Sequence, residues 1–380
     1  MKFEDFTSGV YRNQYQYKSF LPATINHEWT WDDPRINVLL EKATKALGEL
    51  NAFSLIVPDV DLFIHMHVIK EANTSSRIEG TKTEIDDVIK GVDSIEPEKR
   101  DDWQEVQNYV QAMNEAIQQL ETLPLSLRLI RRTHEILMTS VRGEHKAPGE
   151  FRNSQNWIGG SSLADAAYIP PHVSDLPALL DDFERFLHND KISVPHLIKC
   201  ALAHYQFETI HPFLDGNGRI GRLLITLYLV SNNLLLKPTL YLSDFFEKHR
   251  DQYYDSLSRV RISNDIGQWV RFFLQAVIDT SEKGKKRFEN ILKLRMDIEG
   301  KLPELGGRAK NASIVLRYLY QSPETTIKEI LEHLSLNYNT VNSIVNSFVD
   351  MGILQETTGY SRNRVFRFGA YIDAFNEKDD

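Results

Sequence analysis

The sequence predicts a mostly α protein with a short β-hairpin and a small winged-helix α+β unit at its end. Apolar residues recur at helical spacing through most of residues 33–300. Glycine and proline residues interrupt this pattern at 140–175. After Pro303 and Gly306-Gly307, a separate pattern of three helices and two short strands begins.

Taken in order, residues 1–30 are aromatic and irregular, and we expect an extended arm packed on the main body. The first helix begins at Asp33, and the second, from Pro58, ends near Ile78 with Gly80 after it. The other helices expected before residue 300 are 83–91, 103–120, 127–139, 176–188, 194–209, 219–232, 243–262 and 268–296.

The long segment at 140–175 contains the expected hairpin. Residues 157–158 and 167–169 are apolar or aromatic and flank a turn rich in glycine and serine. A loop of this length in a helical body is usually functional or disordered, and its aromatic side chains favour an ordered, functional segment.

The C-terminal unit follows the winged helix-turn-helix pattern. We expect helices at 312–320, 326–334 and 339–351, then strands at 352–354 and 365–368 around Gly359. The predicted domains are therefore residues 1–110 with the first helices, a core at 111–300, and a winged-helix domain at 309–380.

Composition excludes several classes of protein. The chain of 380 residues is 42% hydrophobic and carries a formal charge of −9, which disfavours a coat on nucleic acid or on an anionic membrane. The single cysteine, Cys200, excludes a disulfide framework and is consistent with a reducing cytosol. With no signal peptide and no membrane-spanning run, we expect a cytoplasmic protein without a membrane partner.

The segment from His211 to Arg222, HPFLDGNGRIGR, concentrates the unusual residues. Glycines at the start of a helix let backbone N–H groups converge on an anion at the positive end of the helix dipole. Arg219 and Arg222 are three residues apart, on one face of the helix. The pattern indicates a site for a diphosphate or triphosphate.

Two further side chains of this segment suit phosphate chemistry. A carboxylate beside bound phosphates, here Asp215, is a usual ligand of Mg²⁺. His211 can accept a proton near neutral pH, as the activation of a hydroxyl requires. The alternative interpretation of this segment is a glycine-rich turn between two helices whose charged side chains are solvated. The combination of a base, a carboxylate, a glycine turn and two arginines argues against that interpretation.

The segment resembles the Fic family motif, His-x-Phe-x-(Asp/Glu)-Gly-Asn-Gly-Arg-x-x-Arg, at every specified position. The resemblance extends over residues 30–300 and implies the helical Fic fold. It also implies transfer of AMP from ATP to a Ser, Thr or Tyr hydroxyl of a target protein and of the enzyme itself. Gly218 and Arg222 distinguish the chain from the Doc branch, which has a Lys in the glycine turn and lacks the second arginine.

By this resemblance, His211 is the catalytic base, Phe213 a buried anchor, and Asp215 the ligand of Mg²⁺ or Mn²⁺. The Asn217 side chain would hold the α-phosphate and Arg222 the γ-phosphate. The residues implied to bind the nucleotide are Glu79, Gly216, Asn217, Gly218, Arg219, Ile220, Gly221, Arg222 and Tyr253.

A second resemblance concerns Ser75-Ser-Arg-Ile-Glu79-Gly80. A glutamate in the last turn of a helix opposes the helix dipole, which invites a tertiary explanation. The pattern resembles the inhibitory helix of Fic proteins, in which Glu79 would pair with Arg222 and occupy the γ-phosphate position. Ser75 would support the cap of that helix.

The resemblance also places a target-docking flap at Tyr168, Ile169 and Pro170, which would bind the target by strand addition. For Tyr253 the other interpretation is an aromatic residue of a helix core. Histidines such as His134 show no spacing typical of a metal site, and we expect them to be surface or core residues.

The alternatives that remain are a nucleotide-sensing regulator that binds DNA and a hydrolase that removes AMP in the same pocket. Residues 301–380 hold nine Lys and Arg against ten Asp and Glu, so DNA binding through residues 309–380 is weakly supported. The wing, Arg362–Arg367, is locally basic. A homodimer is consistent with the resemblance.

Overall fold

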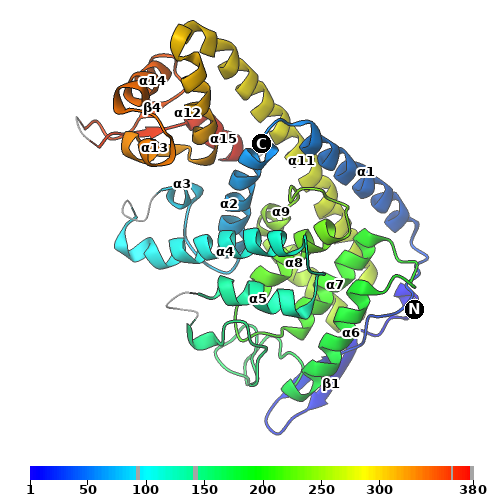
Figure 1. The fold of residues 1–380 in the computed structure, drawn as a ribbon. Helices are drawn as coiled ribbons and strands as arrows, with labels where there is room; N and C mark the ends of the chain where they lie inside the picture. Colours follow the sequence, from blue (N-terminus) through cyan, green and yellow to red (C-terminus); the bar gives the residue numbers. More distant parts are fainter. Residues whose placement is uncertain (91–94, 140–143, 361–362, 377–380) are drawn as a thin grey trace.

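The computed structural model describes residues 1–90, 95–139, 144–360 and 363–376, and it is mostly helical (Figure 1). Two helices at its centre, α7 (His196–Ile210) and α8 (Asn217–Ser231), are buried on nearly every side and pack against each other. A helix that is apolar on every side belongs in the core of a larger protein. The segment between them is the predicted phosphate-binding motif.

The helices around this pair follow the apolar spacing of the sequence. They are α1 (Pro34–Ile56), α2 (Val60–Ile78), α3 (Ile85–Val88), α4 (Arg100–Gln119), α5 (Leu127–Leu137), α6 (Leu176–His188), α9 (Ser243–Lys248), α10 (Arg250–Ser263) and α11 (Ile266–Lys301). The long helix α11 runs beside α1, and the two are joined at their starts by Arg271 and Asp33, at 2.6 Å (Figure 1).

Two helix predictions and one domain boundary differ from the structure. The helix expected at 243–262 is two helices, because the backbone leaves the helical region at His249. The helix expected at 83–91 is the single turn α3, and residue 91 lies outside the described residues. The domain boundary placed at residue 110 falls inside α4, so that division of the chain stays a prediction.

The N-terminal segment is more regular than the extended arm that we expected. Strands β1 (Gly9–Asn13) and β2 (Lys18–Pro22) pair antiparallel as a hairpin. Phe20 is fully buried beside Tyr168, and its N–H donates to the carbonyl of Ile169 at 2.9 Å. This hairpin therefore packs on the one expected at 157–169, where Ile158 and Tyr168 form a single antiparallel bridge.

The C-terminal unit contains α12 (Ala309–Gln321), α13 (Ile327–His333) and α14 (Tyr338–Asp350), as expected. A three-stranded sheet has the order β3-β5-β4, where β3 is Glu324–Thr326, β4 Gln355–Glu356 and β5 Val365–Arg367. The sequence did not predict β3 or the last helix, α15 (Gly369–Asn376). Helices α12 and α15 pack on the first half of α2 through Phe63, whose ring lies 5.2 Å from that of Tyr320.

Candidate functional site

One buried arginine, Arg152, holds the loop between α7 and α8. Helix α7 ends at His211, whose backbone adopts the left-handed conformation at φ 50°. Arg152 is 3% exposed, and its guanidinium donates to the carbonyls of His211 at 3.0 Å and Pro171 at 2.6 Å. These bonds tie the loop to the end of the hairpin segment and compensate the strained backbone of His211.

A stacked pair of rings fixes the middle of the loop. The ring of Phe213 is fully buried, as expected of an anchor, and lies 3.7 Å from the parallel ring of His134. The N–H of Gly149 donates to His134 Nδ1 at 2.9 Å, so the proton of a neutral ring is on Nε2, which donates to the carbonyl of Asp215 at 3.0 Å. Burial lowers the pKa of His134 to about 4, which keeps this tautomer neutral.

His211 is half-buried at the mouth of the same loop. Burial lowers the pKa of its imidazole to about 4, so the ring is neutral at physiological pH. Its Nδ1 atom is buried and has no hydrogen-bond partner among the described residues. A neutral imidazole has one ring nitrogen without a proton, and an accessible nitrogen of this kind can accept a proton from a hydroxyl.

The glycine turn opens α8 as the sequence predicts. Gly216 is the residue before the helix and has φ 74°, a left-handed conformation that glycine adopts at low cost. The first N–H groups of α8 lack partners within the helix and face an anion site at its positive end. The Asn217 side chain does not face this site: its amide accepts from the N–H of Phe213 and donates to the carbonyl of Phe213, both at 2.8 Å. The amide thus closes the loop, and the expected contact of this side chain with a phosphate stays a prediction.

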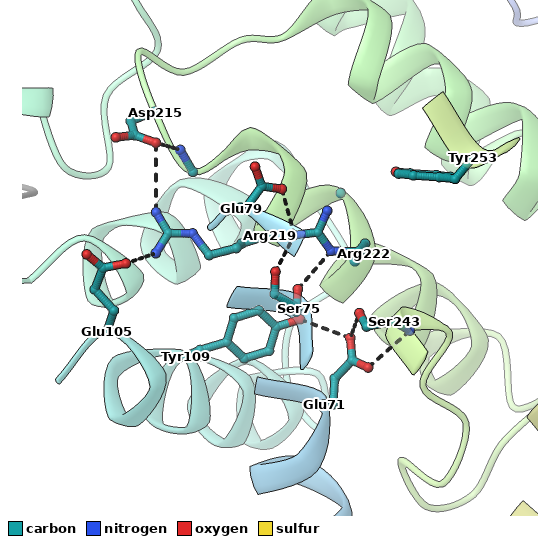
Figure 2. A network of polar contacts seen from close by, with 12 residues as sticks. Glu71, Ser75, Glu79, Glu105, Tyr109, Asp215, Arg219, Arg222, Ser243 and Tyr253 are labelled. Carbon is teal, nitrogen blue, oxygen red and sulfur yellow. Dashed lines mark hydrogen bonds and ion pairs between the residues drawn. The ribbon is translucent and has the colours of Figure 1, made fainter. Parts of the chain in front are cut away.

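The two arginines of the motif have different partners (Figure 2). Arg219 pairs with Glu105 of α4 at 3.2 Å and lies 3.8 Å from Asp215. Arg222 donates to the hydroxyl of Ser75, to the carbonyl of Ser75 and to the carboxylate of Glu79, each at 2.8 Å. Ser75 therefore holds Arg222 rather than the end of its own helix.

The carboxylate of Glu79 covers the anion site itself. A Cβ added at Gly218 would overlap Glu79 Oε1, so this oxygen lies against the first turn of α8. Burial raises the pKa of Glu79, but the positive charge of Arg222 outweighs it, and the pKa is lowered overall. Burial likewise lowers the pKa of Arg222, and the charge of Glu79 more than reverses this. An ionised carboxylate thus occupies the position that suits a phosphate.

A second layer of carboxyl groups surrounds Arg222. Glu71 lies one turn before Ser75 on α2 and accepts hydrogen bonds from the hydroxyl of Ser243 and, at 3.3 Å, from that of Tyr109 (Figure 2). Glu208 of α7 is buried against Gly221, and its Oε1 atom has no partner among the described residues. Burial raises the pKa of each of these two carboxyl groups to about 7.

Asp215 is the candidate metal ligand. Its side chain is 47% exposed, and its Oδ1 atom accepts from the N–H of Gly216 at 2.6 Å. No group of three or more His, Cys, Asp and Glu side chains is placed to hold a metal ion within the described part of the chain. A single exposed carboxylate at the anion site fits Mg²⁺, which takes its other ligands from water and phosphate.

The other predicted site residues lie around this centre. Ile220 and Gly221 are buried in the first turns of α8, and the N–H of Ile220 donates to the carbonyl of Gly216, so their contact with a nucleotide stays a prediction. Tyr253 of α10 is buried, and its hydroxyl is 2.9 Å from His204 Nε2, so it lies deeper than a residue that contacts a ligand directly. Tyr168, Ile169 and Pro170 are buried too, and the Tyr168 hydroxyl donates to the carbonyl of Thr209 at 2.7 Å.

Sequence reasoning did not single out several side chains that build the site. They are Glu71, Glu105, Tyr109, His134, Arg152, Glu208 and Ser243. One signal was present: Glu71, Ser75 and Glu79 are four residues apart and so share one face of α2. Contacts such as that of Glu71 with Ser243 join residues far apart in the chain and leave no local pattern.

These features define the class of site: a helix start suited to a phosphate-bearing ligand, beside a neutral histidine, in a helical core. Residues 38–118 match the Fic/DOC family N-terminal model, and residues 124–229 match the Fic/DOC family model. The chain belongs to the Fic/DOC family.

Curated and structural relatives agree with this family. A protein adenylyltransferase Fic of Drosophila grimshawi is 30% identical over 266 residues, which are 68% of this chain and 50% of the relative. The corresponding protein of Drosophila erecta is 38% identical over 136 residues, 36% of this chain and 24% of the relative. The chain thus spans half or less of the length of these curated relatives.

Solved structures show the same fold. A Fic family protein of Desulfovibrio desulfuricans G20 has a TM-score of 0.55 at 21% identity, over 89% of this chain and 96% of that protein. Residues 134–508 of Fic-1 from C. elegans have a TM-score of 0.51 at 20% identity, over 69% of this chain and 75% of that one.

Within the described residues, no helix is both long and apolar enough to cross a membrane.

Proposed function

We propose that this protein transfers AMP from ATP to a hydroxyl side chain of a target protein and of itself, and that Glu79 inhibits the transfer. The curated relatives named protein adenylyltransferase support the activity. The observation that carries the inhibition is the carboxylate of Glu79, which lies 2.8 Å from Arg222 and against Gly218.

In this mechanism His211 takes the proton of the target hydroxyl, whose oxygen attacks the α-phosphorus while pyrophosphate leaves. The pKa of about 4 keeps His211 neutral and ready to accept that proton. Backbone N–H groups of the first turn of α8 bind the phosphate oxygens, and Arg222 binds the γ-phosphate once Glu79 has moved. Mg²⁺ or Mn²⁺ held by Asp215 would neutralise phosphate charge. Positioning and charge neutralisation supply most of the catalysis in such transfers.

The inhibition follows from competition for one cation. Glu79 and a γ-phosphate both need Arg222, and two anions cannot occupy the same position beside Gly218. ATP then binds with its phosphate chain displaced from the line of attack, because the γ-phosphate lacks its arginine. Displacement of the phosphate chain removes the alignment of the target hydroxyl with the α-phosphorus that the reaction requires.

Target docking and the role of the C-terminal unit are further parts of the proposal. Because Tyr168–Pro170 are buried and Ile169 already accepts from Phe20, a target strand would use the exposed side of the hairpin near Trp157, which is 41% exposed. The winged-helix unit would contact protein: Arg364 is bonded to Asn342 and Asn346 of α14, and Arg367 to Asp86 and Glu324. Arg362 of the wing lies outside the described residues, and a homodimer and the cytoplasmic location stay predictions from the sequence.

The test compares labelling by α-³²P-ATP with Mg²⁺, alone and with cell lysate, in wild type and in Glu79→Gly. We expect labelling to rise about tenfold or more in Glu79→Gly, because the γ-phosphate then reaches Arg222. Glu84→Gly is the matched control, since this exposed carboxylate pairs only at the surface with Arg77, and its labelling stays at the wild-type level.

The double variant Glu79→Gly/His211→Ala should bind ATP and lose the labelling. Flat labelling in Glu79→Gly despite ATP binding would contradict the inhibition, and full labelling in the double variant would contradict the role of His211. Release of AMP from a labelled target by wild type, but not by Glu79→Gly, would assign the reverse, hydrolytic reaction to this pocket.

A further inference from the structure

A cavity lies along α2 one turn before Ser75, on the side of the helix that also carries Ser75 and Glu79. It has a volume of about 240 Å³ and is bounded by α2, α9 and α11 together with the segment before α9. Glu71 lies between the two sites: it lines this cavity and is one helical turn from Ser75, which holds Arg222. The cavity is thus separate from the anion site of α8 but shares the inhibitory helix with it.

The lining of the cavity has more positive than negative charge. Lysine and arginine side chains from three helices reach it, namely Lys70, Lys248, Lys283 and Arg287. The acidic side chains that line it are Glu71, Asp244 and Asp279. Asp244 is engaged by Lys70 at 2.7 Å and by the Thr74 hydroxyl at 3.0 Å. Glu71 accepts from two hydroxyl groups, and with a pKa raised by burial to about 7 it is partly protonated at neutral pH.

His67 forms part of the buried wall of the cavity. The side chain of His67 is 4% exposed, and its Nε2 atom has no hydrogen-bond partner in the part of the chain that the structure describes. The rings of Phe288 and Phe375 pack on His67 at 4.9 and 5.0 Å and fix its orientation. His67 therefore gives the cavity a rigid wall, and the charged side chains of the lining are the groups that can bind an anion.

We propose that this cavity binds a small phosphate-bearing anion, which Lys70, Lys248 and Arg287 hold from three different helices. Neither Lys248 nor Arg287 pairs with a carboxylate among the described residues, so both are available to an oxyanion. The volume accommodates inorganic phosphate or pyrophosphate. Charge-assisted bonds from several side chains are the usual basis of such recognition.

The anion joins α2 to α9 and α11, and this gives it a regulatory effect. Lys70 belongs to the same helix as Ser75 and Glu79, so an anion that cross-links Lys70 to Arg287 stabilises α2 in the position that holds Glu79 on Arg222. The bound anion therefore strengthens the inhibition. This effect rests on the proposed function, whereas the binding of the anion does not.

Isothermal titration with pyrophosphate, without Mg²⁺, tests the site itself. We expect Arg287→Gln and Lys248→Gln each to weaken binding to the cavity by about tenfold, since each removes one charge-assisted contact. Lys286→Gln, an exposed neighbour of Arg287 on α11 that does not line the cavity, should bind as wild type does. Equal binding in all four proteins would overturn the proposal, because the pyrophosphate would then occupy only the start of α8.

The labelling assay with added inorganic phosphate tests the regulatory effect. Phosphate should lower the labelling by wild type and by Lys286→Gln, and leave that by Lys248→Gln and by Glu79→Gly unchanged. A response of Lys248→Gln equal to that of wild type would contradict the coupling. If no protein labels anything, the proposed function fails, and the titration still decides whether the anion site exists.

Discussion

The two arginines at the start of α8 lie one turn apart, but the regions that hold them differ in kind. Arg219 is bound by Glu105 from the middle of α4, on the outer side of the loop. Arg222 is bound by Glu79 from the very end of α2, directly over Gly218 (Figure 2). Glu105 thus fixes an arginine in place, whereas Glu79, on the proposed function, occupies the position of the γ-phosphate.

Exposure separates the two carboxylates in the same way. The side chain of Glu105 is 15% exposed and that of Glu79 is 37% exposed, although both arginines are almost fully buried. A group that must leave when a ligand enters is better placed at an accessible helix end than within a helix. On the proposed function, two Arg–Glu pairs on one helix therefore differ in role: the pair at Arg219 serves stability and the pair at Arg222 serves control.

The largest effect expected from this comparison is on stability. Glu105→Gln should lower the free energy of unfolding by about 3 kcal/mol, because it leaves Arg219 buried with only the half-exposed Asp215 nearby. Glu79→Gln should lower it by less, about 1 kcal/mol, because Ser75 still accepts from Arg222 through its hydroxyl and its carbonyl and the partly exposed carboxylate of Glu79 is screened by solvent. Urea unfolding followed by circular dichroism measures both values. Equal losses would show that the two pairs have the same role.

The sequence was sufficient for the part of the site that is local. The motif from His211 to Arg222 is a continuous turn and helix start, so its residue types alone predict the anion site. The pairing of Glu79 with Arg222 spans 143 residues and was expected only from the resemblance. The contacts of Glu71 with Ser243 and of Arg152 with His211 had no signal, since burial and register decide them.

The same limit applies to the fold. Most helices follow from apolar spacing, but the break at His249 is invisible because the spacing continues across it. The N-terminal hairpin was missed because its pairing depends on the burial of Phe20 against Tyr168, in a segment far along the chain. The internal use of the Asn217 amide by the loop was likewise not predicted.

A smaller effect is expected when the geometry of Arg222 is changed without loss of charge. In the Glu79→Gly background, Arg222→Lys should raise the KM for ATP about tenfold and leave kcat nearly unchanged, because lysine lacks the planar fork that suits a phosphate. Arg219→Lys in the same background should change the KM for ATP less than Arg222→Lys does, and it should lower the free energy of unfolding. Steady-state labelling at several ATP concentrations separates the two. A fall in kcat alone for Arg222→Lys would assign Arg222 to the reacting phosphate.

The smallest effect expected is that of pH on the inhibition between pH 6 and pH 8. Arg222 lowers the pKa of Glu79 despite burial, so the carboxylate is ionised above its ordinary range and loses its charge only as the pH falls below that range. The ratio of labelling by Glu79→Gly to that by wild type should therefore be constant within about twofold from pH 6 to pH 8.

The nearby Glu71 provides the contrast for this measurement. Burial raises its pKa to about 7, so its protonated form contributes stability at low pH, and this contribution is lost as the pH rises through 7. Glu71→Gln removes that titration and keeps a hydrogen-bonding side chain beside Ser243 and Tyr109. The same ratio is measured for the chain with Glu71 and for the chain with Glu71→Gln. A ratio that changes with pH only when Glu71 is present would show that Glu71, through its position on α2, controls the inhibitory helix. A ratio that changes equally in both would contradict the ionised pair of Glu79 and Arg222.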